Sequence, residues 1–183
     1  MDGLLVNLFD TVAQRFCGKN YKQLNQNQKN NIRKIWTNKK EFDKYFNSAQ
    51  ELFENLKPFG HDGEITNTIV KTVVDVFGEY NILSHPTQID REGCIRGKRK
   101  WIEKFLTCPP KEVYFAKNKA EYALEGGTRN ILVDDWKPYL INWKNRGGMA
   151  IQMRSDTFVS KDDAQEFLKK EFQKLNIDNT VKI

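Results

Sequence analysis

Polar and charged side chains follow three short apolar segments of this sequence, each at the point where the segment ends. Ser84 and His85 follow residues 80–83, Lys117 and Lys119 follow residues 112–116, and Asp134 and Asp135 follow residues 130–133. Carboxylate oxygens are the ligands that a hard cation such as Mg²⁺ prefers, whereas lysines and hydroxyls bind phosphate oxygens. Together these residue types predict a metal-assisted site for phosphoryl chemistry.

Each of these side chains also has a simpler structural explanation when it is taken alone. A hydroxyl or an acid after a strand often caps the helix that follows, which would account for Ser84, Asp134 and Asp135. Lysines in such positions are usually solvated surface charges. The joint placement of all these residues after apolar segments favours the site. His85 could then touch a substrate from the same edge.

The elements that must position these residues are short strands that alternate with helices in the second half of the chain. Strands are predicted at residues 80–83, 112–116, 130–133 and 149–153, and helices at residues 98–106, at 164–172 and through Tyr139, Leu140 and Trp143. This alternation predicts an α/β fold with a parallel sheet that is covered on both faces. Ligands bind at the carboxyl ends of such strands, where the residues named above would gather.

The first half of the chain is mainly helical in its pattern. Apolar spacing predicts helices at residues 4–16, at 42–56 and at 65–76, the last with Asp62 as its N-cap. The stretch 17–70 interrupts the alternation of strands and helices, which predicts an insert after the first strand–helix step. The aromatic residues of this insert could stack a nucleotide base or form its own core; they are Trp36, Phe42, Tyr45 and Phe46.

The composition is that of one globular domain, or of a domain with a small insert. The 183 residues carry a net charge of +6 with lysines spread along the chain, which suits an anionic small substrate, and nucleic acid is not an expected partner. The sequence has no apolar run of about 18 residues and no basic amino-terminal segment, so a cytoplasmic location without a membrane partner is expected. The spacing of Cys17, Cys94 and Cys108 predicts neither a disulfide nor a zinc site.

Five motifs lie in order along the chain. They are Met1-Asp2-Gly3-Leu4-Leu5, Ile82-Leu83-Ser84-His85-Pro86, Lys98-Arg99-Lys100-Trp101-Ile102-Glu103, the apolar strand with a basic pair at residues 113–119, and Ile131-Leu132-Val133-Asp134-Asp135. This ordered set resembles the HAD superfamily of phosphohydrolases, in particular its 5'(3')-deoxyribonucleotidases. The resemblance implies a HAD-like Rossmannoid fold, a three-layer parallel sheet formed by residues 1–16 and 71–183, with a small helical cap insert at residues 17–70.

The resemblance also implies roles for individual residues. Asp2, Ser84 and Lys98 would be catalytic; Ser84, His85, Lys117 and Lys119 would bind the substrate; and Asp2, Asp134 and Asp135 would bind Mg²⁺, with the choice between the last two left open. The implied activity is that of a Mg²⁺-dependent phosphatase, a phosphoric monoester hydrolase similar to 5'-nucleotidases, acting on nucleoside monophosphates. Other small phosphate esters, such as sugar phosphates, or a nucleic-acid 3' end are alternative substrates.

The sequence departs from the family pattern at the catalytic nucleophile. In the family this aspartate lies two residues before the one that matches Asp2, and only Met1 precedes Asp2 here. An aspartyl-phosphate mechanism depends on that nucleophile. The chain as written is therefore expected to be inactive or to be a truncated reading of a longer product. The alternative function is that of a catalytically inactive HAD-fold protein that binds a nucleotide or another partner.

Overall fold

The computed structural model describes residues 1–175, which form two compact units. Within these residues, unit 1 comprises Met1–Val6, Pro58–His85 and residues 106–175, and unit 2 comprises Asn7–Lys57 and Pro86–Phe105. Each unit is described by itself below. In the part of the chain that is described, no helix is both long enough and apolar enough to cross a membrane.

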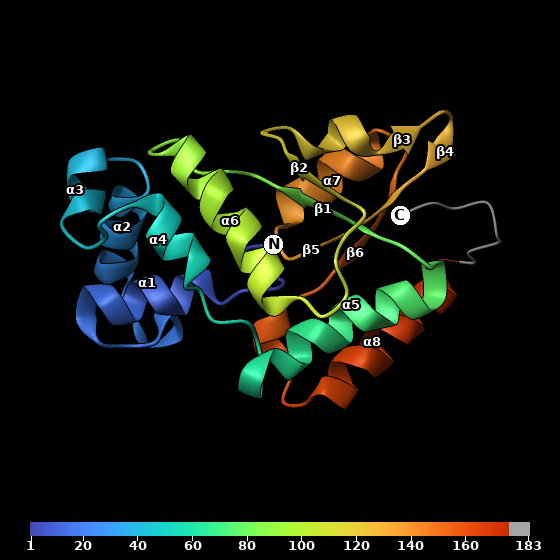
Figure 1. The fold of residues 1–183 in the computed structure, drawn as a ribbon, viewed down its shortest axis with the longest axis horizontal. Coiled ribbons are helices and arrows are strands. Elements are labelled where there is room, and N and C mark those ends of the chain that lie inside the picture. The colour runs from blue at the N-terminus through green and yellow to red at the C-terminus, as the bar shows by residue number, and fades with distance from the viewer. Residues whose placement is uncertain (176–183) are drawn as a thin grey trace. The chain divides into compact units, whose positions relative to one another are not determined.

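Unit 1 contains two pairs of parallel strands, as Figure 1 shows. Strand β1 (Asn81–Ser84) pairs with β2 (Glu112–Phe115), and β5 (Ile131–Asp134) pairs with β6 (Met149–Gln152). Their short apolar sequences are typical of strands covered on both faces. All four predicted strands are confirmed to within a residue or two, and the fold is mixed α/β.

The four strands do not form the single sheet that the sequence predicted. Within residues 1–175, β1 pairs only with β2 and β5 pairs only with β6. Both β1 and β5 contribute to the lining of a mainly apolar pocket of about 300 Å³.

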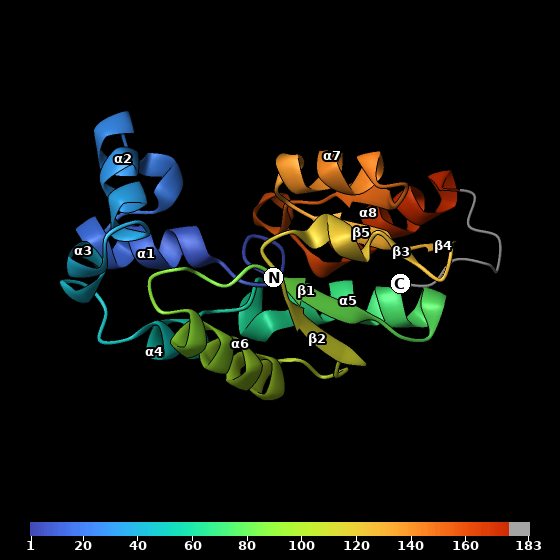
Figure 2. The ribbon, with the colours of Figure 1, turned by 90° about the horizontal axis from the view of Figure 1, so that it is seen from above.

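Three helices cover these strands, and α5 (Glu64–Phe77) lies side by side with α8 (Lys161–Lys174) in both ribbon views (Figure 2). The Phe77 and Phe172 rings meet nearly at right angles, with their centroids 4.9 Å apart. Helix α7 (Lys137–Asn145) packs on β5 and β6. The predicted N-cap of α5 at Asp62 is wrong, because Gly63 occupies that position and Asp62 lies in the left-handed region at φ 52°.

Shorter elements connect the helices and strands. A two-residue hairpin pairs β3 (Leu124–Glu125) with β4 (Thr128–Arg129) around Gly126 and Gly127, both of which have positive φ. The sequence did not predict this hairpin because neither strand has an apolar pattern. The 3₁₀ turns are η1 (Tyr21–Gln23), η2 (His61–Gly63), η3 (Lys119–Tyr122) and η4 (Ser155–Thr157).

Unit 2 is entirely helical in the structure. Its helices are α1 (Leu8–Cys17), α2 (Gln26–Ile35), α3 (Lys39–Asp43), α4 (Ala49–Glu54) and α6 (Arg91–Phe105). Helices α4 and α6 approach closely at Gly97, where a Cβ atom would lie 2.4 Å from the Gln50 carbonyl oxygen. The Trp101 indole N–H donates a 2.7 Å hydrogen bond to the Leu56 carbonyl in the same region.

The compact units and the predicted domains have different boundaries. The sequence predicted an insert at residues 17–70, whereas unit 2 includes residues 7–16 and 86–105 and leaves residues 58–70 in unit 1. Three aromatic residues of the predicted insert pack on one another, with the Phe42 ring 6.1 Å from that of Trp36 and 5.1 Å from that of Phe46, whereas Tyr45 packs on Phe16, outside that insert, at 5.5 Å. Phe42 is fully buried, so it serves the core of unit 2.

The predicted helix at residues 42–56 is divided into α3 and α4. The break occurs at Ser48, whose extended backbone (φ −159°, ψ 158°) cannot continue a helix. The Ser48 hydroxyl accepts a 3.0 Å hydrogen bond from the Glu51 N–H and so caps α4. The apolar spacing runs through this break, which is why the sequence pattern predicted a single helix.

Ser48→Ala should lower the free energy of unfolding by about 1 kcal/mol, because it removes the N-cap of α4. Ser48→Asp supplies another capping oxygen and should keep most of the stability. Urea denaturation followed by circular dichroism measures both variants against the parent protein. Equal stability of the alanine variant and the parent would show that the helix break does not depend on this cap.

Candidate functional site

A buried ion pair between Lys119 and Asp134 lies at the centre of the candidate site. Asp134 ends β5 and Lys119 begins η3, and the Lys119 ammonium donates to Asp134 Oδ2 at 2.5 Å. Their side chains are only 6% and 5% exposed. The other carboxylate oxygen of Asp134 accepts the Trp136 N–H at 2.9 Å, where α7 begins. Asp134 therefore both balances a buried charge and orders the start of a helix.

Tyr139 connects this ion pair to His85. The Lys119 ammonium lies 4.7 Å from the centroid of the Tyr139 ring, and the Tyr139 hydroxyl lies 2.6 Å from His85 Nδ1. Burial raises the pKa of Tyr139, and the negative charges of Asp134, Asp2 and Asp135 raise it further. The phenol is therefore protonated at neutral pH and can donate a hydrogen bond to the imidazole.

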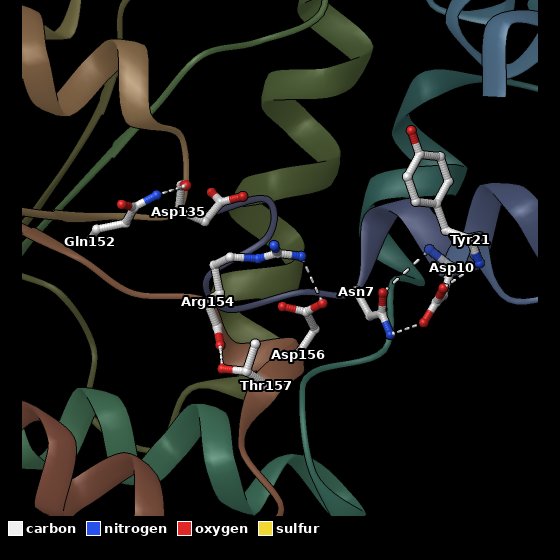
Figure 3. Close-up of polar contacts among 8 residues, drawn as sticks. All are labelled: Asn7, Asp10, Tyr21, Asp135, Gln152, Arg154, Asp156 and Thr157. Carbon is white, nitrogen blue, oxygen red and sulfur yellow. Dashed lines mark hydrogen bonds and ion pairs between the residues drawn. The ribbon is translucent and has the colours of Figure 1, made fainter. Parts of the chain in front are cut away.

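Asp135 lies against the loop that contains Asp2 and Gly3. A Cβ atom at Gly3 would be 2.2 Å from Asp135 Oδ2, and Gly3 has φ +78°, so both space and backbone conformation require glycine there. The Asp135 backbone carbonyl accepts a 3.4 Å hydrogen bond from Gln152 (Figure 3). Burial raises the pKa of Asp135 from 3.8 to about 6, helped by the charge of Asp134 and opposed by the amino-terminal charge.

The other predicted residues of unit 1 lie at the same strand ends. Ser84 ends β1 and is almost completely buried, directly before His85. Lys117 is exposed, and with Lys119 and Tyr139 it lines a cavity of about 580 Å³. The sequence therefore predicted correctly that these residues follow strands, although it did not distinguish the buried lysine from the exposed one.

Lys98 belongs to unit 2. It is fully buried in α6, and its ammonium lies 4.7 Å from the centroid of the Phe53 ring, a distance typical of a cation–π contact. Its predicted catalytic role remains a prediction. Unit 2 also contains a polar cluster, shown in Figure 3. In it, Asp10 accepts hydrogen bonds from the Asn7 side chain at 2.9 Å and from the Tyr21 N–H at 2.7 Å.

Two residues of this cluster, Tyr139 and Gly3, are not evident as site residues from the sequence. The sequence pattern identifies Tyr139 only as an apolar position of a helix. Its position near the start of the helix that follows Asp134 is the signal that could have identified it, because that turn lies at the carboxyl end of β5. The requirement for glycine at position 3 comes from the Asp135 carboxylate, which is distant in sequence.

No family model, curated protein or solved structure matches this chain. The geometry and charge of the cluster are therefore the observations on which a function can be argued. The three acids Asp2, Asp134 and Asp135 gather near two positive charges, the Lys119 ammonium and the amino-terminal group. Such a cluster attracts a cation and repels an anion unless a cation is bound.

The donor atoms of this cluster fit a hard cation that keeps some of its own water. Among residues 1–175, no three His, Cys, Asp or Glu side chains are arranged as a metal site. Mg²⁺ does not require one, because it is usually held by one or two carboxylates together with water and phosphate oxygens. Lys119 and the Trp136 N–H already occupy the Asp134 carboxylate, so Asp135 is the better placed of the two adjacent acids.

Lys119→Met should lower the free energy of unfolding by about 3–5 kcal/mol, because it leaves Asp134 buried without a counter-charge. The double variant Lys119→Met with Asp134→Asn should recover most of this loss, since a neutral amide can still accept the Trp136 N–H. Urea denaturation at pH 7 measures both. Lys169→Met, at an exposed position of α8, is the matched control and should not change stability. A single variant as stable as this control would contradict the assigned role of the ion pair.

Asp135→Asn should stabilise unit 1 at neutral pH. The raised pKa means that folding favours the protonated carboxyl, so its stabilising contribution is complete below pH 3.8 and is lost as the pH rises through about 6. At pH 7 the variant should gain on the order of 2 kcal/mol, and the gain should vanish near pH 4. Unfolding measured from pH 4 to 8 tests this, with the exposed Glu112→Gln as control. A gain that does not depend on pH would rule out titration of Asp135 as its cause.

Proposed function

We propose that unit 1 carries a Mg²⁺-dependent site for the phosphate group of a small phosphate ester, and that its chemistry is phosphoric monoester hydrolysis of the HAD type. The observation that carries this proposal is the buried Lys119–Asp134 pair beside Asp135 and the Asp2–Gly3 loop. A lysine, several carboxylates and a hydroxyl at the carboxyl ends of parallel strands are the groups that phosphoryl chemistry needs.

Charge balance explains why the site should need a cation. A phosphate dianion would be repelled by the adjacent acids Asp134 and Asp135, because the Lys119 ammonium is already bound to Asp134. Asp135 and Asp2 are the residues that would hold Mg²⁺, which supplies positive charge to the phosphate oxygens when it is bound. A bound cation also favours the charged form of Asp135, whose pKa burial raises to about 6 in its absence.

The remaining residues would bind and orient the ester. Lys119 adds positive charge next to Asp134, and the Ser84 hydroxyl would hold a phosphate oxygen as the resemblance implies. The hydrogen bond between Tyr139 and His85, at 2.6 Å, fixes the imidazole at the same edge. Exposed Lys117 can reach a substrate in the cavity that it lines with Lys119. The resemblance supports a nucleoside monophosphate as substrate, with sugar phosphates as the nearest alternative.

A second candidate function is phosphate binding without hydrolysis. The 2.5 Å contact between Lys119 and Asp134 favours it, because an ammonium committed to a carboxylate offers less charge to a transition state. The two candidates share a binding step and differ only in turnover.

A nucleoside monophosphate should bind this protein only in the presence of Mg²⁺, because the three acids repel the free phosphate. Isothermal titration with deoxyribonucleoside, ribonucleoside and hexose monophosphates, in Mg²⁺ or in EDTA, measures the affinity, and release of inorganic phosphate measures turnover. Asp135→Asn should weaken Mg²⁺-dependent binding by about tenfold or more. Lys169→Met should bind like the parent protein.

The outcomes separate the two candidates. Binding with phosphate release supports hydrolysis, whereas Mg²⁺-dependent binding without release supports the second candidate. Equal binding in Mg²⁺ and EDTA would contradict the charge argument. If none of the esters binds, both proposed functions are contradicted.

A further inference from the structure

The acids of this chain are unevenly distributed, although its lysines are spread along it. Residues 11–40 contain eight lysines and arginines but no aspartate or glutamate, and ten of the other residues are asparagine or glutamine. Unit 2, which contains this acid-free segment, has sixteen basic residues and eight acids, a net charge of +8. The rest of the sequence has fourteen basic residues and sixteen acids, a net charge of −2. The positive charge of the protein is therefore concentrated in unit 2.

The acid-free segment folds into neighbouring elements of unit 2. It runs from within α1 through η1 and α2 to the start of α3, and α2 contacts both α1 and α3 (Figure 1). Its apolar residues Ile32 and Ile35 are buried, while Lys29 is half-buried. The other seven basic side chains are exposed; they are Arg15, Lys19, Lys22, Arg33, Lys34, Lys39 and Lys40. The fold thus brings these charges together at the surface of unit 2.

The stability of α2 does not explain why acids are absent. An acid in the first turn stabilises a helix, and α3 and α4 each have one there, whereas α2 has none. The α2 cap uses neutral amides, since the Asn25 N–H donates to Gln28 Oε1 at 3.1 Å and the Gln28 N–H donates to Asn25 Oδ1 at 3.0 Å. In α8 the corresponding residue is Asp163, which accepts the Ser160 N–H at 3.0 Å. Gln28 keeps the geometry of the cap without adding a negative charge, which indicates a surface that serves an anionic partner.

Two aromatic rings lie beside these charges. The Phe9 ring, on a residue that is 40% exposed, lies 5.0 Å from the Tyr21 ring, and the Lys29 ammonium lies 5.5 Å from the Tyr21 centroid. Bases of single-stranded nucleic acid stack on accessible aromatic rings, while lysines and arginines bind its phosphates. Asparagine and glutamine side chains can form hydrogen bonds with base edges. In a duplex the base faces are covered by neighbouring base pairs, so the rings favour a single strand.

We infer that unit 2 binds single-stranded nucleic acid on the surface formed by the acid-free segment and Phe9. Phosphates would lie along the basic side chains, and bases would stack on the Phe9 and Tyr21 rings. An anionic membrane fits this surface less well, because Ile32 and Ile35 are buried and α2 presents no apolar face to lipid. The spread of the lysines alone led to the expectation that nucleic acid is not a partner, and the absence of acids from residues 11–40 outweighs it. The inference does not depend on the phosphate site of unit 1.

Fluorescence anisotropy of labelled oligothymidylate and oligouridylate, each of about 20 nucleotides, tests the inference on the whole protein. The affinity should fall as NaCl is added, by about 0.7 in the slope of log K against log salt for each phosphate contact. Arg33→Gln with Lys34→Gln changes two exposed residues, and it should reduce the slope by about 1.4 and weaken binding about tenfold or more at about 0.1 M NaCl. Binding of either oligonucleotide supports the inference, and the stronger of the two identifies the preferred sugar.

The matched control is Lys169→Gln with Lys170→Gln on α8 of unit 1. It removes the same number of charges from exposed positions, so it should change neither the affinity nor the slope. Equal weakening by the two double variants would show that only the net charge matters, and it would overturn the inference.

Two further variants separate binding from folding. Phe9→Leu keeps an apolar side chain and should weaken single-strand binding about fivefold or more without changing the salt slope. Gln28→Glu keeps the cap of α2, so it should raise the melting temperature by about 1–3 °C while weakening binding about twofold or more.

Three other results would also overturn the inference. One is a duplex of the same length that binds as tightly as the single strand and is unaffected by Phe9→Leu. Another is the absence of binding to both oligonucleotides at about 0.05 M NaCl, where electrostatic binding is strong. The third is binding to vesicles that contain phosphatidylserine without binding to either oligonucleotide, which would assign the surface to an anionic membrane.

Discussion

The Lys119–Asp134 ion pair places two opposite charges in the interior of unit 1, where neither would be stable alone. The need to keep these two charges paired determines the positions of more residues than Lys119 and Asp134 alone. Because Asp134 ends β5 and also accepts the Trp136 N–H, the pair sets where η3 lies relative to the start of α7. Tyr139 is thereby held within reach of the ammonium, and His85 is held by Tyr139. The edge of the strands that carries the chemistry thus depends on one buried electrostatic contact.

The residues of strand β5 differ in chemistry along its length. Its carboxyl end carries the adjacent acids Asp134 and Asp135, while its middle residues line an apolar space. Burial is the largest cause of the raised pKa of Asp135, whose carboxylate lies against the Gly3 loop. A change in the packing of that loop would therefore alter the chemistry at the end of the strand.

The sequence predicted local structure well and tertiary structure less well. The four strands and the acids after β5 could be found because apolar runs and the residues that follow them are local features. The break at Ser48 was missed because its extended backbone interrupts a helical pattern that the apolar spacing continues. The roles of Tyr139 and Gly3 depend on contacts with Lys119 and Asp135, which no spacing along the chain can reveal. The sequence also could not show that β1 and β5 do not pair, because these strands are about fifty residues apart and strand pairing at that distance is not a local feature.

The division of the chain into two units has a consequence for the order in which the protein can be made. The chain passes from one unit to the other after Val6, Lys57, His85 and Phe105, so neither unit is encoded by one continuous stretch. A ribosome must synthesise residue 105 before unit 2 has all of its helices, and the first segments of unit 1 must wait longer for β5 and β6. Helices α1 to α4 therefore emerge without α6, and the surface of α4 that α6 later covers stays exposed during that interval.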